Sequence, residues 1–184
     1  MPAREERCSI AGGRLDAEQA VVWDGGWPDR PPAALLDLME RLHWRTVARY
    51  GCGMVRVRRG EGVVSCDALG GVPMLVFERN GERVEPRSVE RRWRIAAGVL
   101  VRPVAPDAWT RGAFALGLAG QDGRLRAWVR VEAFPSRFLL TGGGWLGDVL
   151  AGLYSRFHAR VSFAYLEALR RQLSETTTRP STPA

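Results

Sequence analysis

The sequence contains no lysine, and its single asparagine is Asn80. All 27 basic residues are therefore arginines, and with 20 acidic residues they give a formal net charge of +7. Such a bias is typical of a GC-rich genome, so the high charge does not by itself indicate a nucleic-acid-binding protein. The planar guanidinium of arginine pairs with carboxylates and stacks on aromatic rings. We expect most of these arginines to pair with acidic side chains on solvated faces.

Cysteine and histidine are also scarce. The three cysteines, Cys8, Cys52 and Cys66, are odd in number and form no CxxC pair, which argues against a disulfide framework and against a zinc site. Cys66 alternates with apolar residues, so we expect a small buried hydrophobic side chain there. The two histidines, His43 and His158, lie far apart in the sequence without carboxylates at ligand spacing. The sequence therefore predicts neither a metal site nor a cofactor.

Long apolar runs are missing as well. No uninterrupted run approaches the length of a membrane-spanning helix, and the N-terminal MPAREERCSIAGG lacks the apolar core of a signal peptide. We therefore expect a cytoplasmic protein. The hydrophobic content of 46% in 184 residues suffices for the core of one domain. We expect a flexible tail over residues 1–17, a single domain over 18–173 and a disordered tail over 174–184.

Within that domain, the sequence predicts short strands and two helices. A strand is expected over Glu18–Trp23, and a helix over Pro32–Arg49 with an apolar stripe that includes Leu35, Leu38 and Met39. From Met54 onward, short apolar runs are separated by glycines. Asn80-Gly81 predicts a type I′ hairpin turn, and residues 82–104 fit either two or three strands.

A second hairpin has the clearest alternation. GAFALGLAG and RLRAWVRVEAF flank Gln121-Asp122-Gly123, and their alternating apolar and polar residues predict antiparallel strands with one buried and one wet face. A long helix follows over Gly143–Leu173. Its apolar residues recur every three or four positions. The expected buried stripe consists of Leu146, Val149, Leu150, Leu153, Phe157, Val161, Tyr165, Leu169 and Leu173.

This order of elements resembles the helix-grip architecture of the START-like superfamily, which includes Bet v 1-like proteins and polyketide cyclases. The last hairpin, followed by WLGDVLAGLYSRFHARVSFAYLEALRRQL, carries the resemblance, which is one of pattern and covers residues 18–173. Two features depart from the family: one long helix stands where two short ones are usual, and the strand count is uncertain. A lipocalin-like barrel with terminal helices would give a similar pattern. The resemblance implies an α+β fold, in which an antiparallel sheet wraps the C-terminal helix and leaves a cavity.

Proteins of this shape generally bind a hydrophobic small molecule or lipid, so the resemblance implies that function and those partners. An apolar lining of the cavity would draw on residues from the sheet and from the long helix. We expect it to include Trp93, Phe114, Val129, Tyr154, Phe157 and Tyr165. A solid, ordinarily packed core is the alternative. The expected burial of Phe157 implies that Phe157→Asp would unfold the domain.

Three further hypotheses remain open. The same cavity could serve a cyclase- or aromatase-like enzyme, although no catalytic residue is assigned, because a general base at His158 has no acid or nucleophile placed near it by the sequence. Both histidines are expected at the surface or its boundary. Arg126, Trp128 and Arg130 share a strand face that could contact nucleic acid, which we disfavour, or an anionic membrane surface. A structural or interaction domain without a cavity is the third possibility.

Overall fold

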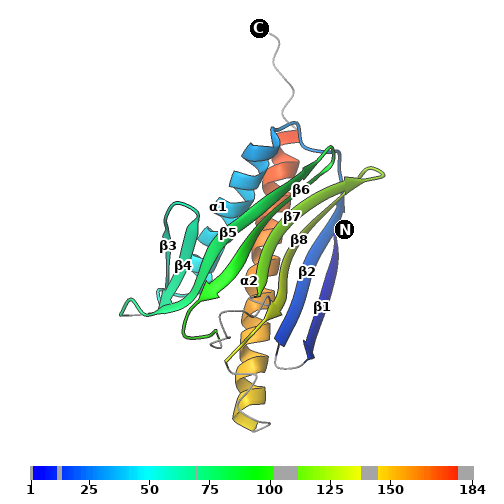
Figure 1. Ribbon diagram of the computed structural model, residues 1–184. Coiled ribbons are helices and arrows are strands. Elements are labelled where there is room, and N and C mark those ends of the chain that lie inside the picture. Colours follow the sequence, from blue (N-terminus) through cyan, green and yellow to red (C-terminus); the bar gives the residue numbers. More distant parts are fainter. Residues whose placement is uncertain (1, 12–13, 69, 102–111, 138–144, 178–184) are drawn as a thin grey trace.

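The computed structural model describes residues 2–11, 14–68, 70–101, 112–137 and 145–177, without the side chains of residues 145–151, 153, 154, 176 and 177. Within these ranges, an antiparallel sheet of eight strands is covered on one face by two helices (Figure 1). The strand order is β1-β2-β8-β7-β6-β5-β4-β3. The expected α+β architecture, with a sheet packed on a long C-terminal helix, is confirmed.

The elements follow one another as β1 (Ala3–Ala11), β2 (Arg14–Asp24), α1 (Pro32–Tyr50), β3 (Val55–Arg59), β4 (Val63–Ala68), β5 (Pro73–Glu85), β6 (Ser88–Ala97), β7 (Ala113–Gln121), β8 (Arg124–Phe134) and α2 (Trp145–Thr177). The helix predicted over Pro32–Arg49 is α1. It begins at Pro32, the second of two consecutive prolines, where a missing N–H costs no helical hydrogen bond. The long helix continues to Thr177, into the expected C-terminal tail. The glycines at 143 and 144 lie outside the described residues.

The expectation of a flexible tail over residues 1–17 is wrong for most of that segment. Ala3–Ala11 forms β1, which pairs with β2 in antiparallel register from Ala3 opposite Val22 to Ala11 opposite Arg14. Every residue of β1 is exposed. Since neither face of this edge strand is buried, it lacks the apolar alternation by which a strand is recognised in a sequence.

The turn predicted at Asn80-Gly81 is also wrong, because β5 runs through both residues to Glu85. Arg79 lies opposite Trp93 and Gly81 lies opposite Arg92, so Asn80 is the extra residue of a bulge. Gly81 has φ 131°, a conformation that glycine adopts at little cost. The strands instead turn at Pro86-Arg87, between the paired residues Glu85 and Ser88.

The β7–β8 hairpin follows the prediction. Asp122 and Gly123 form its two-residue turn and both have positive φ, 51° and 74°, as a type I′ turn requires. The alternation then sends apolar residues toward the helices, and these include Phe114, Leu116, Leu118, Leu125, Ala127, Val129 and Val131, all buried.

Arg91 links α1 to the sheet through ion pairs. Its side chain is only 5% exposed, and its guanidinium donates to Glu40 at 2.6 Å and to Asp37 at 3.0 Å, both on α1. It also contacts Glu82 on β5 at 2.8 Å. A buried arginine needs such carboxylates, since an unpaired charge there would cost several kcal/mol. These contacts hold the helix over the sheet.

Candidate ligand pocket

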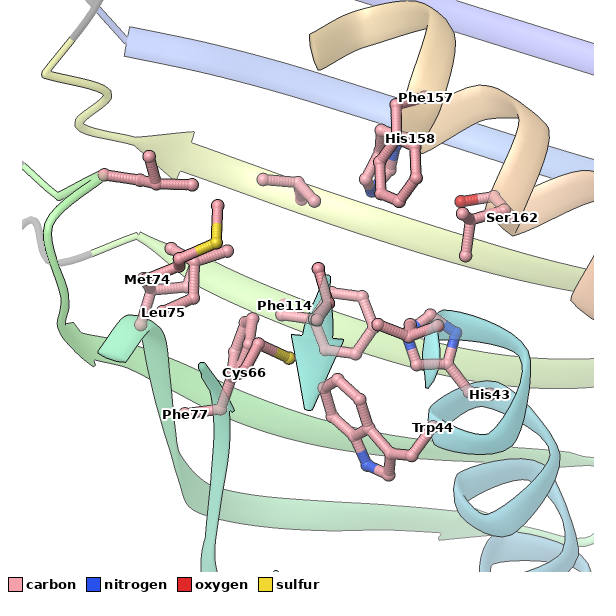
Figure 2. A pocket seen from close by; sticks show the side chains of 16 residues that line it. His43, Trp44, Cys66, Met74, Leu75, Phe77, Phe114, Phe157, His158 and Ser162 are labelled. Carbon is pink, nitrogen blue, oxygen red and sulfur yellow. The ribbon is translucent and has the colours of Figure 1, made fainter. Parts of the chain in front are cut away.

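A pocket of about 150 Å³ lies between the two helices and the central strands (Figure 2). Strands β3 to β8 supply one wall and α1 and α2 the other. Its described lining consists of His43, Trp44, Val47, Val55, Cys66, Met74, Leu75, Phe77, Ile95, Leu100, Phe114, Val131, Phe157, His158, Val161 and Ser162. The space between sheet and helix is therefore hollow at this place, and the alternative of a solid core does not hold there.

None of these described lining residues is an Asp, Glu, Lys or Arg. Cys66 adds no charge either, because burial raises the pKa of its thiol to about 12, with the neighbouring Asp67 acting in the same direction. A thiol that stays protonated is inert as a nucleophile. Cys66 is therefore a small apolar part of the wall, and its predicted burial is confirmed at 7% exposure.

Besides Trp44 with its indole N–H, three side chains with hydrogen-bonding groups, His43, His158 and Ser162, lie on the helical side of the pocket (Figure 2). His43 comes from α1, and the other two lie one turn apart on α2. Burial lowers the pKa of His43 to about 3, and the positive charge of Arg59, together with that of His158 when it is protonated, acts in the same direction. Burial likewise lowers the pKa of His158, to about 4. Both imidazoles are therefore neutral at physiological pH.

Two of these side chains hold polar atoms without a partner. The Nδ1 atom of His43 and the Oγ atom of Ser162 have no hydrogen bond within the described part of the chain. The residues are 4% and 1% exposed. The Nε1 atom of Trp44, which also lines the pocket, is a third such atom. Most buried polar groups in proteins are hydrogen-bonded, so three such exceptions in one pocket wall call for a physical explanation.

Of the six residues predicted to line a cavity, two belong to the described lining of the pocket and three lie in the core outside that lining. Phe114 and Phe157 line the pocket. Trp93 and Val129 are fully buried in the core and do not belong to the described lining. Tyr165 is also fully buried, with its ring centroid 5.1 Å from that of His43. The side chain of Tyr154 lies outside the described residues.

Phe157 is less buried than its place in the stripe predicts. It is 42% exposed, and the expectation that Phe157→Asp unfolds the domain loses its basis. One turn further along α2, Val161 is 4% exposed. Helical periodicity identifies the face of a helix that turns inward, but it does not show where along that face the covering layer ends.

The prediction that both histidines lie at the surface or its boundary is wrong for His43. Its imidazole is enclosed by aromatic rings, with centroids of Trp44 and Phe114 at 4.7 and 4.9 Å. His158 is partly buried, at the boundary. The sequence held one signal for His43: it lies four residues after Met39 and next to Trp44, on the buried side of the predicted helix.

No comparable sequence signal marks the far end of the pocket. Met74 and Leu75 follow Pro73 in β5, and Leu75 lies opposite Cys66 across the β4–β5 ladder. Leu100 and Val101 come after the end of β6, and Val101 forms an isolated bridge with Ser136. These contacts join segments that are distant in the chain, so periodicity within one segment cannot reveal them.

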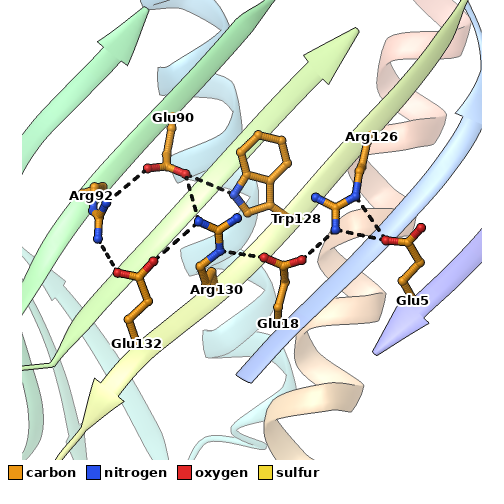
Figure 3. Close-up of polar contacts among 8 residues, drawn as sticks. All are labelled: Glu5, Glu18, Glu90, Arg92, Arg126, Trp128, Arg130 and Glu132. Carbon is orange, nitrogen blue, oxygen red and sulfur yellow. Dashed lines mark hydrogen bonds and ion pairs between the residues drawn. The ribbon is translucent and has the colours of Figure 1, made fainter. Parts of the chain in front are cut away.

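The Arg126, Trp128 and Arg130 face does not offer free arginines and a free ring (Figure 3). Arg126 is held by Glu5 at 3.0 Å and by Glu18 at 2.6 Å. Arg130 is also held by Glu18 at 2.6 Å.

Trp128 is closed in by the same network and is only 7% exposed. Its indole N–H donates to Glu90 at 3.2 Å, and the two guanidiniums lie 5.6 and 5.8 Å from its ring. The carboxylates that neutralise these arginines also repel phosphates. The arrangement fits the stabilisation of an exposed sheet face better than a nucleic-acid or headgroup contact.

The described part of the chain contains no group of three or more His, Cys, Asp or Glu residues that could hold a metal ion. Neither of its helices has a stretch long and apolar enough to cross a membrane.

No family model and no curated protein matches the chain. Among solved structures, it is similar to Ara h 8.0201, at 13% identity with a TM-score of 0.44 over 85% of this chain and 99% of that one. It is also similar to a protein from Bacillus thuringiensis, at 10% identity with a TM-score of 0.40 over 82% and 98% of the two chains. CalU16 from Micromonospora echinospora is a third, at 14% identity with a TM-score of 0.28 over 95% and 99%.

Likenesses of this strength carry no information on a ligand or an activity, and the fold is established by the chain's own elements. In the described part of the chain, two helices pack on one face of the sheet, and the longer helix is the last element. The chain therefore has a helix-grip arrangement, in which an antiparallel sheet packs against a long C-terminal helix.

Proposed function

We propose that this protein binds an apolar small molecule in the pocket between its sheet and its helices. The observation that supports the proposal is the pocket itself, whose described walls are almost entirely aliphatic, aromatic or sulfur-bearing side chains. The transfer of an apolar ligand from water into such a site lowers the free energy, so binding is favourable.

The volume indicates the size of the ligand. An apolar cavity of roughly 150 Å³ in another protein takes up benzene and stays free of water when empty. The pocket is also partly open beside Phe157, whose ring is 42% exposed. These features favour a ligand with about one aromatic ring, or a short aliphatic chain, over a complete two-chain lipid.

The test is mass spectrometry of organic extracts from the purified protein, compared with a variant whose pocket is filled. Leu75→Trp places a large ring in the wall, and Val84→Trp on the same strand is the matched control, because Val84 is 53% exposed and lies outside the described lining. We expect a compound that co-purifies with the wild type and with Val84→Trp but not with Leu75→Trp. Equal extracts from all three proteins would count against the proposal.

An enzyme that uses the same pocket is the second candidate. The convergence of His43, His158 and Ser162 on the pocket favours it. The lowered pKa values of both histidines, about 3 and about 4, oppose it, since a general base works best when its pKa lies near the ambient pH. Turnover of a co-purified compound that is abolished in His158→Ala, with binding retained, would decide for the enzyme.

A further inference from the structure

The pocket has two ends of different chemistry. In Figure 2, His43, His158 and Ser162 lie on the side of the helices, while Cys66, Met74 and Leu75 lie at the opposite end, on the strands. A ligand with a polar group at one end would therefore bind in one orientation.

From this division we propose that the pocket selects an uncharged small molecule with one hydroxyl or carbonyl group, which points toward His43 and Ser162 while the apolar body points toward Cys66 and Met74. The inference rests on the proposed binding function and specifies its ligand class.

The described pocket wall carries no charge, which disfavours an ionic ligand. The described lining holds no ionised side chain that could pair with a carboxylate or an ammonium group of a ligand. Burial also keeps the neighbouring imidazoles of His43 and His158 neutral, since it lowers their pKa values to about 3 and about 4. A charged ligand would lose its hydration and gain no counter-charge in return.

Two polar atoms of the pocket wall, in addition to Nε1 of Trp44, are buried without a hydrogen-bond partner in the described residues. Ser162 is 1% exposed and His43 is 4% exposed, and both side chains belong to the pocket wall. Their Oγ and Nδ1 atoms make no hydrogen bond within the described residues. A wholly apolar ligand would leave both atoms unsatisfied, whereas a ligand with a hydroxyl or carbonyl group could satisfy at least one of them.

The hydrogen-bonding groups of Ser162 and His43 determine which ligand groups would fit. A serine hydroxyl donates one hydrogen bond and accepts others, and a neutral imidazole has one donor and one acceptor nitrogen. Rotation about χ1 re-aims the hydroxyl of Ser162 without moving α2. The pair can therefore serve either a hydroxyl or a carbonyl group, and an amphipathic molecule such as a phenol has the required shape.

Four probes of one size test the inference: toluene, p-cresol, p-toluate and p-methylbenzylammonium, each titrated by calorimetry into the whole protein. We expect p-cresol to bind roughly fivefold or more tightly than toluene, because one net hydrogen bond is gained. We expect no measurable binding of the two ions. Equal affinities for p-cresol and toluene, or tighter binding of either ion, would overturn the inference.

Ser162→Ala separates recognition from folding. Because the hydroxyl of Ser162 has no partner in the described structure, its loss should leave the melting temperature unchanged or slightly raised. In this variant we expect the advantage of p-cresol over toluene to shrink by roughly fivefold while toluene affinity stays the same. Ser174→Ala, an exposed serine on the same helix and outside this pocket, is the control and should behave as the wild type.

The outcomes also separate this inference from the binding function itself. If toluene and p-cresol bind equally well, the apolar pocket is occupied and only the polar selection is wrong. If none of the four probes binds, the proposed function fails and the selection fails with it. An advantage of p-cresol that survives unchanged in both Ser162→Ala and His43→Phe would assign the polar contact to other residues and overturn the inference.

Discussion

Gly117 and Trp128 lie opposite each other on the outer face of the β7–β8 hairpin, and the indole ring fills the space of a side chain at position 117. A Cβ atom at Gly117 would lie 2.0 Å from Cζ2 of Trp128. The ring has little freedom to move aside, because Glu90 accepts its N–H and the guanidiniums of Arg126 and Arg130 lie over it. A glycine at this position is therefore required by packing.

Gly117→Ala should lower the free energy of unfolding by about 1–3 kcal/mol, the usual cost of an overpacked site. Urea denaturation measures the change. Trp128→Ala removes the obstacle, so Gly117→Ala in that background should cost much less than in the wild type. A cost that is the same in both backgrounds would show that the ring is not the reason for the glycine.

The burial of His43 predicts how stability depends on pH. Its pKa is lowered from the ordinary 6.5 to about 3 by burial, so the unfolded chain binds a proton below pH 6.5 that the folded protein does not bind. The free energy of unfolding should therefore fall as the pH drops from 6.5, by about 1.4 kcal/mol for each pH unit and each such histidine. Urea titrations at pH 6.5, 6.0, 5.5 and 5.0 measure the slope.

This window isolates the two histidines, because unperturbed Asp and Glu side chains stay largely ionised above about pH 5 in folded and unfolded chains alike. His43→Phe retains a ring of similar size and should remove the contribution of His43, leaving that of His158. An unchanged slope in His43→Phe would mean that the imidazole of His43 reaches solvent in the folded state.

Phe157→Asp is expected to fold, in contrast to the expectation from helical periodicity alone. The ring is 42% exposed, so a carboxylate there remains hydrated and should cost no more than about 1 kcal/mol. Val161→Asp, one turn further along α2 and 4% exposed, should cost about 3 kcal/mol or more, because the charge is buried without a partner. Circular dichroism during thermal unfolding compares the two, and equal losses would contradict the described boundary of the core.

The elements that were predicted well are those whose signal lies within one segment. The helix over Pro32–Tyr50 and the β7–β8 hairpin each carry their own periodicity and their own turn residues. The long helix was likewise recognised from its apolar stripe. Its buried residues from Val161 to Leu173 follow that stripe, and Leu166 is buried beside it.

The errors arose where pairing with another segment decides the outcome. Asn80-Gly81 is a strong local turn signal, yet the pairing of β5 with β6 up to Glu85 and Ser88 turns it into a bulge. The exposed strand β1 is held by β2 alone, without an apolar face. The pocket itself joins residues from two helices and several strands, and its empty space has no sequence signal at all.

The most direct test of the account is a toluene titration followed by methyl NMR of the leucine, valine, isoleucine and methionine side chains. The account predicts saturable shifts confined to the pocket, above all at Met74, Leu75, Leu100 and Val131, with Val84 and Ile10 unchanged as exposed controls. Leu75→Trp should abolish these shifts without unfolding the protein. Shifts that do not saturate, or that appear at the exposed controls as strongly as at the pocket, would contradict the claim that this cavity is a binding site.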